Sequence, residues 1–162
     1  MDIWTERLAP RHLPCLAPWL GRPDAALTEN DLPRAAEGLE AWYAARAAEP
    51  GRLDCLVSVY ETPVGLASLR RQAERPDTAA LSLLLGERGY NPSRTAAYAA
   101  LRMLDRGFLE EGLRRVTARV PERCAWFAEL LERMGFTRTA EGEDWIALAA
   151  EREAWLSRKH LF

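Results

Sequence analysis

The residue types that most often carry out chemistry are scarce in this chain of 162 residues. Only two histidines occur, His12 and His160, so a histidine-centred metal site or a Ser-His-Asp triad has few residues to draw on. The three cysteines, Cys15, Cys55 and Cys124, stand at unrelated spacings that match no metal motif and predict no disulfide framework. These counts exclude several large classes of enzyme.

The composition is that of an ordinary globular protein, with 48% hydrophobic and 28% charged residues. A chain of this length suits one domain with a full core, so we expect a single domain over residues 1–162. The net charge of −2 and the scattered arginines give no reason to expect nucleic acid or a membrane as partner. Because no apolar run approaches the roughly 20 residues that span a bilayer, and no leader pattern opens the chain, we expect a cytoplasmic protein.

The hydrophobic pattern predicts the elements that must position any site. In the first half we expect a strand at 3–8, helices at 13–20 and about 32–47, a hairpin at 54–60 and 64–69, and a central strand at 79–85. In the second half we expect a long helix ending near 111, a strand at 115–120, a helix at 121–134, strands at 136–139 and 145–149, and a tail, 151–162, that forms a short helix. Asp31 is expected to be the N-cap of the second helix.

The order of these elements predicts the fold class. It runs strand, two helices, three strands, helix, strand, helix and two strands, which indicates an α/β domain with a mixed sheet and helices on both faces. The run from Ala79 to Leu85 is apolar on both faces, as is typical of a central strand covered on both sides.

Several stretches of the sequence resemble the GNAT N-acetyltransferases. Thr5–Leu8 with Arg11, and Glu151–Leu156, resemble the branch that includes the ribosomal-protein-alanine acetyltransferases, while Leu130–Phe136 and Phe108–Val116 resemble helix ends common in the family. The resemblance implies the GNAT (acyl-CoA N-acyltransferase) fold, with a mixed, mostly antiparallel sheet. It also implies that the chain transfers an acetyl group from acetyl-CoA to a primary amine of a small molecule or peptide, and family members often form homodimers.

The resemblance further implies where acetyl-CoA binds. In the family, backbone N–H groups at the start of the long helix hold the pyrophosphate, since helix N-termini have free donors and a favourable dipole. The central strand would part from the strand at 115–120 and open a cleft in which the pantetheine arm pairs with strand backbone. The positions of this chain that match are Leu83, Leu84, Leu85, Asn91, Ser93, Arg94, Thr95 and Ala96.

The loop before the long helix departs from the family pattern. The family has Arg or Gln, then a central Gly, then Gly or Ala, where this chain has Asn91, Arg94 and Ala96. Pro92 also removes a donor N–H. Two readings follow: the Arg94 guanidinium contacts a phosphate directly, or its bulk excludes the cofactor. We favour retained binding.

Candidate catalytic residues are few. A base must take the proton of the attacking ammonium, and the central strand offers only Ser82, with Glu87 just beyond it. Cys124 and Phe127 occupy positions where the family often has Asn and Ser, and Cys124 could act as a thiol acid. Each has a structural reading as well: a core hydroxyl for Ser82, a solvated carboxylate for Glu87, and a small buried residue for Cys124. His12 is expected to be an exposed loop residue.

An acceptor pocket in this fold would lie between the early helices and the strands that follow. Trp19, Trp42 and Tyr43 are the candidates to line it, and the alternative is that Trp42 and Tyr43 belong to the helix's core stripe. This part of the sequence contains no acidic cluster that would indicate a polyamine acceptor. It also contains no basic cluster that would indicate an anionic acceptor.

Three functions are compatible with these patterns. The first is an active acetyl-CoA-dependent N-acetyltransferase, which we favour. The second is a catalytically inactive GNAT-fold protein that acts as a binding or regulatory module, because the loop glycine, the family Asn and an evident base are missing. The third, an unrelated α/β nucleotide-binding domain, fits less well because no other phosphate-binding motif is present. No metal is expected.

Overall fold

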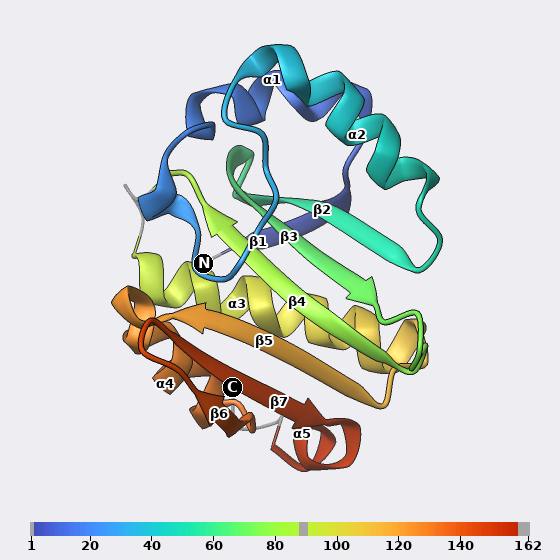
Figure 1. The fold of residues 1–162 in the computed structure, drawn as a ribbon, viewed down its shortest axis with the longest axis vertical. Coiled ribbons are helices and arrows are strands. Elements are labelled where there is room, and N and C mark those ends of the chain that lie inside the picture. Colours follow the sequence, from blue (N-terminus) through green and yellow to red (C-terminus); the bar gives the residue numbers. More distant parts are fainter. Residues whose placement is uncertain (1, 88–90, 159–162) are drawn as a thin grey trace.

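A single seven-stranded sheet forms the centre of the computed structural model, which describes residues 2–87 and 91–158 (Figure 1). Its strand order is β1-β2-β3-β4-β5-β7-β6, and only β4 and β5 run parallel to each other. The strands are β1 (Ile3–Arg7), β2 (Arg52–Val59), β3 (Thr62–Arg71), β4 (Thr78–Leu85), β5 (Arg115–Pro121), β6 (Thr137–Glu141) and β7 (Trp145–Glu151). The mixed, mostly antiparallel sheet expected from the sequence is confirmed.

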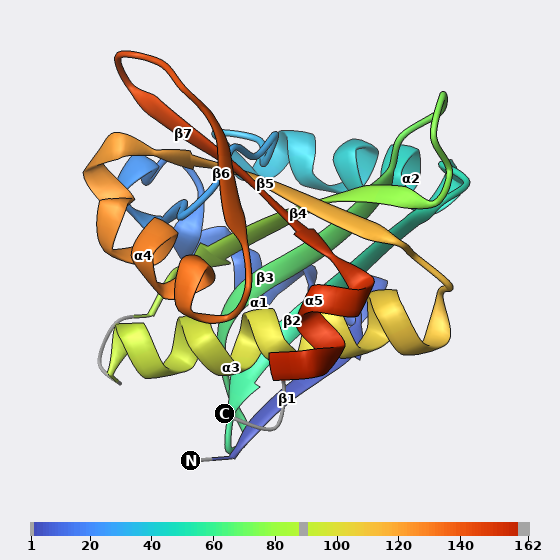
Figure 2. The same cartoon turned by 90° about the horizontal axis from the view of Figure 1, so that it is seen from below.

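Helices cover both faces of this sheet, as Figure 2 shows for α2 on one side and α3 and α5 on the other. The helices are α1 (Leu13–Leu16), α2 (Leu39–Ala48), α3 (Pro92–Asp105), α4 (Ala125–Arg133) and α5 (Arg152–Arg158). A π-helical turn, Arg106–Glu110, extends α3, and Gly112, with a φ of 69°, ends this element. The helix predicted in the tail is present as α5.

Two hydrophobic cores result, one on each face of the sheet. Strand β4 contributes to both, because successive side chains of a strand point to opposite faces. Leu83 and Leu85 pack into the core beneath α3, α4 and α5, whereas Leu84 packs with residues of α1 and α2. This double burial explains the uninterrupted apolar run in the sequence.

The early helical region is shorter and more broken than predicted. The predicted helix at 13–20 is one α-turn, α1, flanked by 3-10 turns at Pro10–His12 and Ala17–Trp19, because prolines 14 and 18 interrupt α-helical hydrogen bonding. Helix α2 begins at Leu39, and Asp31 does not cap it: its carboxylate pairs with Arg46 instead. The long connection between α1 and α2 lies over the sheet, and it builds much of the site described next.

Candidate active site

Strands β4 and β5 pair over only four residues and then part. Their parallel register runs from Thr78 opposite Arg115 to Leu81 opposite Ala118. In Figure 1 the two strands lie together at their starts and move apart toward their arrowheads. The opening predicted between the central strand and its neighbour is therefore present.

The backbone of β4 presents alternate residues to this opening. Gly86 donates its N–H to the Val64 carbonyl at 2.8 Å, so even-numbered residues of β4 bond to β3. Because hydrogen-bonding direction alternates along an antiparallel strand, the backbone groups of Leu83 and Leu85 point the other way, toward the opening.

A short stretch of the α1–α2 connection, residues 26–29, enters the opening, and we call it the bridging segment. Leu27 donates its N–H to the Leu83 carbonyl at 2.9 Å, and the Thr28 hydroxyl accepts the Leu83 N–H at 3.0 Å. Leu27 is fully buried and Thr28 is 2% exposed. Both backbone groups of Leu83 that face the opening are thus already paired within the chain.

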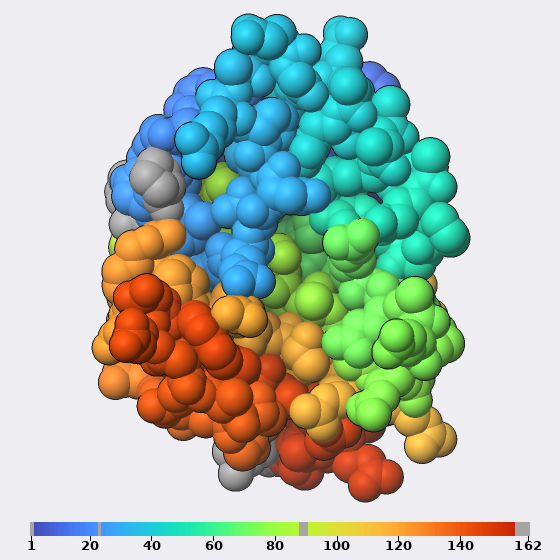
Figure 3. Space-filling view, viewed as in Figure 1, coloured from blue at the N-terminus to red at the C-terminus, as the bar shows by residue number. Residues whose placement is uncertain are grey.

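The bridging segment also contacts the β5 side of the opening. Glu29 donates its N–H to the Arg119 carbonyl at 3.1 Å, and its carboxylate pairs with Arg119 Nε at 2.8 Å. The Ala26 carbonyl accepts from Arg123 at 2.9 Å, with Cys124 Sγ 3.7 Å away. In Figure 3 this part of the chain, in blue, lies between the green of β4 and the orange of the C-terminal strands. The segment therefore closes the inner end of the opening.

Leu85, nearer the mouth of the opening, has one backbone group left to offer. It is 1% exposed, and the antiparallel bridge between Ala26 and Leu84 directs its N–H at Ala25, whereas its C=O has no partner within the described part of the chain. Buried backbone groups are almost always paired, so this carbonyl is suited to a ligand that offers an amide N–H. A pantetheine arm carries such amides.

Helix α3 begins just beyond the mouth of the opening, with Asn91 as its N-cap. The Asn91 side chain accepts the Arg94 N–H at 3.0 Å, and the Asn91 carbonyl accepts the Thr95 N–H at 3.0 Å. Pro92 has no N–H, and the Ser93 N–H has no partner within residues 2–87 and 91–158. The helix start therefore offers fewer donors to a phosphate than a glycine loop would. Residues 88–90, which precede it, lie outside the described residues.

The Arg94 side chain is exposed and extends along α3. Its guanidinium lies 5.9 Å from the ring centre of Tyr98, one turn further along the helix. With Leu101 and Met134 it borders a small apolar pocket of about 180 Å³ between α3 and the end of α4. The Arg94 side chain thus lies on the surface of α3. Thr95 and Ala96 are buried, so their side chains do not face a ligand there.

Among the predicted catalytic residues, Glu87 and Cys124 lie nearest the opening. Glu87 is exposed at the end of β4, and Oε1 accepts the Trp19 Nε1–H at 3.0 Å. Cys124 is buried at the start of α4, against the bridging segment. Ser82 lies on the same face of β4 as Leu84 and is partly buried.

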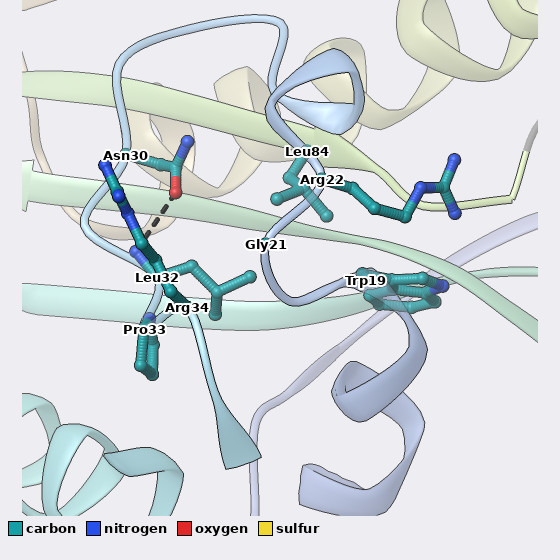
Figure 4. Close-up of a pocket in the computed structure, with 8 residues that line it drawn as sticks. All are labelled: Trp19, Gly21, Arg22, Asn30, Leu32, Pro33, Arg34 and Leu84. Atoms are coloured by element: carbon teal, nitrogen blue, oxygen red, sulfur yellow. Dashed lines mark hydrogen bonds between the residues drawn. The ribbon is translucent and has the colours of Figure 1, made fainter.

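A pocket of about 400 Å³ lies beside the end of β4, on the α1–α2 side of the sheet (Figure 4). Trp19 forms one wall, and its ring packs so closely on Gly86 that a Cβ there would overlap it. The lining residues are Trp19, Gly21, Arg22, Asn30, Leu32, Pro33, Arg34 and Leu84. Of the three predicted acceptor residues only Trp19 lines this pocket, since Trp42 and Tyr43 pack against the smaller core.

His12 is not the exposed loop residue that was predicted. It is 6% exposed, its Nδ1 accepts the Ala9 N–H at 3.0 Å, and its Nε2 lies 3.2 Å from Glu6 Oε1. It therefore caps a local turn, and it is absent from the lining of the pocket.

Sequence reasoning missed the arginines of the pocket and the bridging segment. Arg22 and Arg34 are 12 positions apart and form no cluster in the sequence. Only the folded connection between α1 and α2 brings them to one pocket. The bridging segment has no periodic pattern, and its partner Leu83 is more than 50 residues away. The one available signal was the apolar run Ala25–Leu27 inside a stretch otherwise rich in turn formers.

The fold and the parted strands define an acyltransferase, and comparison with known proteins gives its family. The acetyltransferase (GNAT) domain family matches residues 4–137. The chain belongs to the GNAT acetyltransferase family. Its class of reaction is therefore acetyl transfer from acetyl-CoA to a primary amine. No curated protein sequence matches the chain.

Solved structures agree with the fold. A chimeric spermidine N-acetyltransferase from Vibrio cholerae has a TM-score of 0.82 and 16% identity, covering 98% of this chain and 100% of that one. The Vibrio cholerae enzyme in complex with CoA and spermine has a TM-score of 0.79 and 15% identity, covering 95% of this chain and 98% of that one. At this identity the likeness shows the shared fold alone.

Two searches of the described residues complete the description of the site. No helix among them is long and apolar enough to cross a membrane. Within the same residues, no group of three or more His, Cys, Asp or Glu side chains could hold a metal ion.

Proposed function

We propose that this protein acetylates a primary amine at the opening between β4 and β5, with the amine entering from the pocket beside Trp19. One observation carries the proposal: β4 and β5 part after Leu81, and the buried carbonyl of Leu85 faces the opening without a partner among the described residues, while both backbone groups of Leu83 are paired. Acetyl-CoA, when bound, supplies an activated thioester carbonyl. Leu85 would hold the pantetheine arm, and the bridging segment would set how deep it reaches.

The altered start of α3 can still hold phosphate. The Ser93 N–H has no partner among the described residues, and the exposed Arg94 guanidinium supplies a permanent positive charge with several donors. Arg94 would thus replace, with a side chain, donors that the family obtains from a glycine-rich backbone. Its guanidinium lies 5.9 Å from the Tyr98 ring centre, on the surface of α3.

Two side chains are placed to move protons. Glu87 Oε1 is held by the Trp19 indole at the edge of the pocket, where a carboxylate can take the proton of an entering ammonium. Cys124 Sγ lies against the bridging segment on the other side and can return a proton to a thiolate. Ser82 has no such position at the pocket and is assigned no role.

The acceptor is proposed to be a small molecule or a peptide N-terminus, within the branch that includes the ribosomal-protein-alanine acetyltransferases. The Vibrio cholerae relatives are spermidine N-acetyltransferases, which supports an amine acceptor in general. We also propose a cytoplasmic enzyme that can form a homodimer, without nucleic acid or membrane partners, in keeping with its net charge of −2.

A second function, an inactive GNAT-fold module, is favoured by one observation. The bridging segment takes both backbone groups of Leu83, and Asn91 takes the Arg94 N–H, so fewer donors remain for a cofactor. A module of this kind would use the pocket beside Trp19 for binding alone.

Titration calorimetry with acetyl-CoA separates the two functions. Micromolar binding is expected for the enzyme, and no binding at millimolar cofactor would contradict it. Arg94→Ala should weaken binding about tenfold if the guanidinium contacts phosphate, whereas tighter binding would show that its bulk obstructs the site. Arg102→Ala is the matched control, since Arg102 is also exposed but lies two turns further along α3. Thiol release with a panel of amines then tests turnover.

A further inference from the structure

The pocket beside Trp19 has a charge pattern that the sequence did not suggest. Its lining includes two arginines, Arg22 and Arg34, one amide, Asn30, and no carboxylate. In Figure 4 Arg34 and Asn30 lie on one side of the pocket, and Arg22 and Trp19 lie on the other. The volume of about 400 Å³ is within the range of pockets that bind small molecules.

Each carboxylate in the neighbouring connection is engaged with a cation. Asp24 pairs with Arg22 at 3.6 Å and so offsets part of the charge of that pocket arginine, whereas Glu29 pairs with Arg119 at 2.8 Å, and Arg119 does not line the pocket. The carboxylate of Asp31 pairs with Arg46, a buried residue of α2. None of these three ion pairs involves Arg34.

Arg22 itself has a structural task. It donates to the Gly86 carbonyl at 2.8 Å, and together with the ion pair to Asp24 this fixes the guanidinium at the end of β4. Arg22 therefore contributes only part of its charge to a ligand.

Arg34 is different. Its side chain is exposed, and the described part of the chain gives it neither an ion pair nor a hydrogen bond. The chain at Gly21, where φ is 71°, passes close to the Arg34 carbonyl: a Cβ added at Gly21 would lie 3.3 Å from that oxygen. The Arg34 guanidinium is therefore available to a ligand at the pocket rim.

We infer that the acceptor is an amine that also carries a carboxylate, of the size of an amino acid or a dipeptide, and that Arg34 binds this carboxylate. The guanidinium fork matches a carboxylate in a two-point contact, and Asn30 lies on the same side to add an amide donor. This inference rests on the proposed transfer of an acetyl group to an amine at the same site, and it names the substrate class.

A polyamine is the alternative that the same charges disfavour. Spermidine carries several ammonium groups. Glu87 at the pocket edge can receive one of them, but the lining offers the others two arginines and no carboxylate. Like charges a few ångströms apart repel even near the surface, where solvent weakens the effect. The acceptor of this chain therefore differs from that named for the Vibrio cholerae relatives.

A pair of substrates that differ in one group tests the inference: alanyl-alanine and its C-terminal amide, with spermidine alongside. Thiol release at saturating acetyl-CoA is measured for the unmodified protein, for Arg34→Gln and for Arg75→Gln. Arg75 is an exposed arginine in the β3–β4 loop and is the matched control. We expect kcat/KM to be about tenfold higher for the dipeptide than for the amide, and the preference to disappear only in Arg34→Gln.

The outcomes separate this inference from the proposed function. Equal rates for dipeptide and amide, an unchanged preference in Arg34→Gln, or a faster reaction with spermidine would overturn the carboxylate site. If no amine is acetylated, the proposed function fails, and equilibrium titration of the two dipeptides then decides the inference. Binding of the free acid that is at least fivefold stronger than that of the amide, and lost in Arg34→Gln, supports the site, and equal binding refutes it.

Discussion

Replacing Thr28 by valine tests how firmly the bridging segment is held in the opening. The Thr28 hydroxyl accepts the Leu83 N–H at 3.0 Å and donates to the Glu29 carbonyl at 3.1 Å. Valine has nearly the same shape but no oxygen, so the Leu83 N–H loses its partner while remaining buried. Leu83 is 1% exposed, which leaves water little access to that donor.

The expected cost follows from this geometry. An unpaired buried donor costs about 1–3 kcal/mol, so we expect the free energy of unfolding to fall by about 2 kcal/mol. For a domain of this size, each kcal/mol corresponds to roughly 2–4 °C in Tm, so the midpoint should drop by about 4–8 °C. Thr28→Ser keeps the oxygen and loses one methyl group, and we expect it to cost about 1 kcal/mol.

Urea unfolding of the three proteins measures the global effect, and hydrogen exchange of the Leu83 amide measures the local one. We expect exchange at Leu83 to accelerate in Thr28→Val by more than the change in global stability explains, because the segment can open without unfolding the sheet. If the valine and serine variants have the same stability and the same exchange at Leu83, the hydroxyl does not hold the segment, and the reasoning is refuted.

Four further predictions concern single residues. Arg46→Met should lower the free energy of unfolding by about 3 kcal/mol, because Asp54 then loses the buried guanidinium that it binds at 2.9 Å. Arg70→Met should cost less than about 1 kcal/mol, because the ion pair of Arg70 with Glu49 is exposed. Equal losses of stability for the two variants in urea unfolding would contradict this reasoning. Glu87→Gln should lower kcat about a hundredfold or more with little change in KM, and a loss below threefold in the thiol-release assay would remove it as the base. Burial raises the pKa of the Cys55 thiol from 9.0 to about 11, so in the native protein iodoacetamide at pH 8 should leave Cys55 unmodified, as mass spectrometry of the digested product can show. The folded state favours the neutral Cys55 thiol, so the contribution of this thiol to the free energy of unfolding is complete below about pH 9 and is lost as the pH rises through about 11. Thermal unfolding of Cys55→Ala and of the unmodified protein across this pH range checks this.

The sequence predicted the sheet well, because its strands carry local signals. The hairpin of β2 and β3 was recognised from two apolar runs around a short turn, and the structure places that turn at Tyr60 and Glu61. The central position of β4 followed from an apolar run that matches burial on both faces. The resemblance implied a mixed, mostly antiparallel sheet, and the structure confirms it.

The start of α2 was predicted too early, for a reason that sequence alone does not reveal. Asp31 followed by Leu32 and Pro33 has the composition of a helix start, but the Asp31 carboxylate pairs with Arg46 across 15 residues. Because that ion pair holds the chain over the sheet, the segment between Asp31 and Leu39 stays largely irregular. A distant charged partner outweighed the local capping signal.

The candidate site was only half predictable. Positions along β4 and at the start of α3 lie in sequence order and could be matched to a family pattern. The residues of the pocket could not be found, since Trp19, Arg22 and Arg34 are separated by irregular chain with no period. Their convergence depends on contacts with β4, such as that of Arg22 with the Gly86 carbonyl.

The connection between α1 and α2 therefore does two things at once. Its bridging segment closes the inner end of the opening through Leu83, and its two ends supply the arginines of the pocket. Because Glu29 pairs with Arg119 and Asp31 with Arg46, this connection is anchored to both β5 and α2, so the pocket and the opening share one support. A change in the pocket beside Trp19 that shifts this support should alter the opening as well. The pocket and the opening are for that reason physically coupled in this fold.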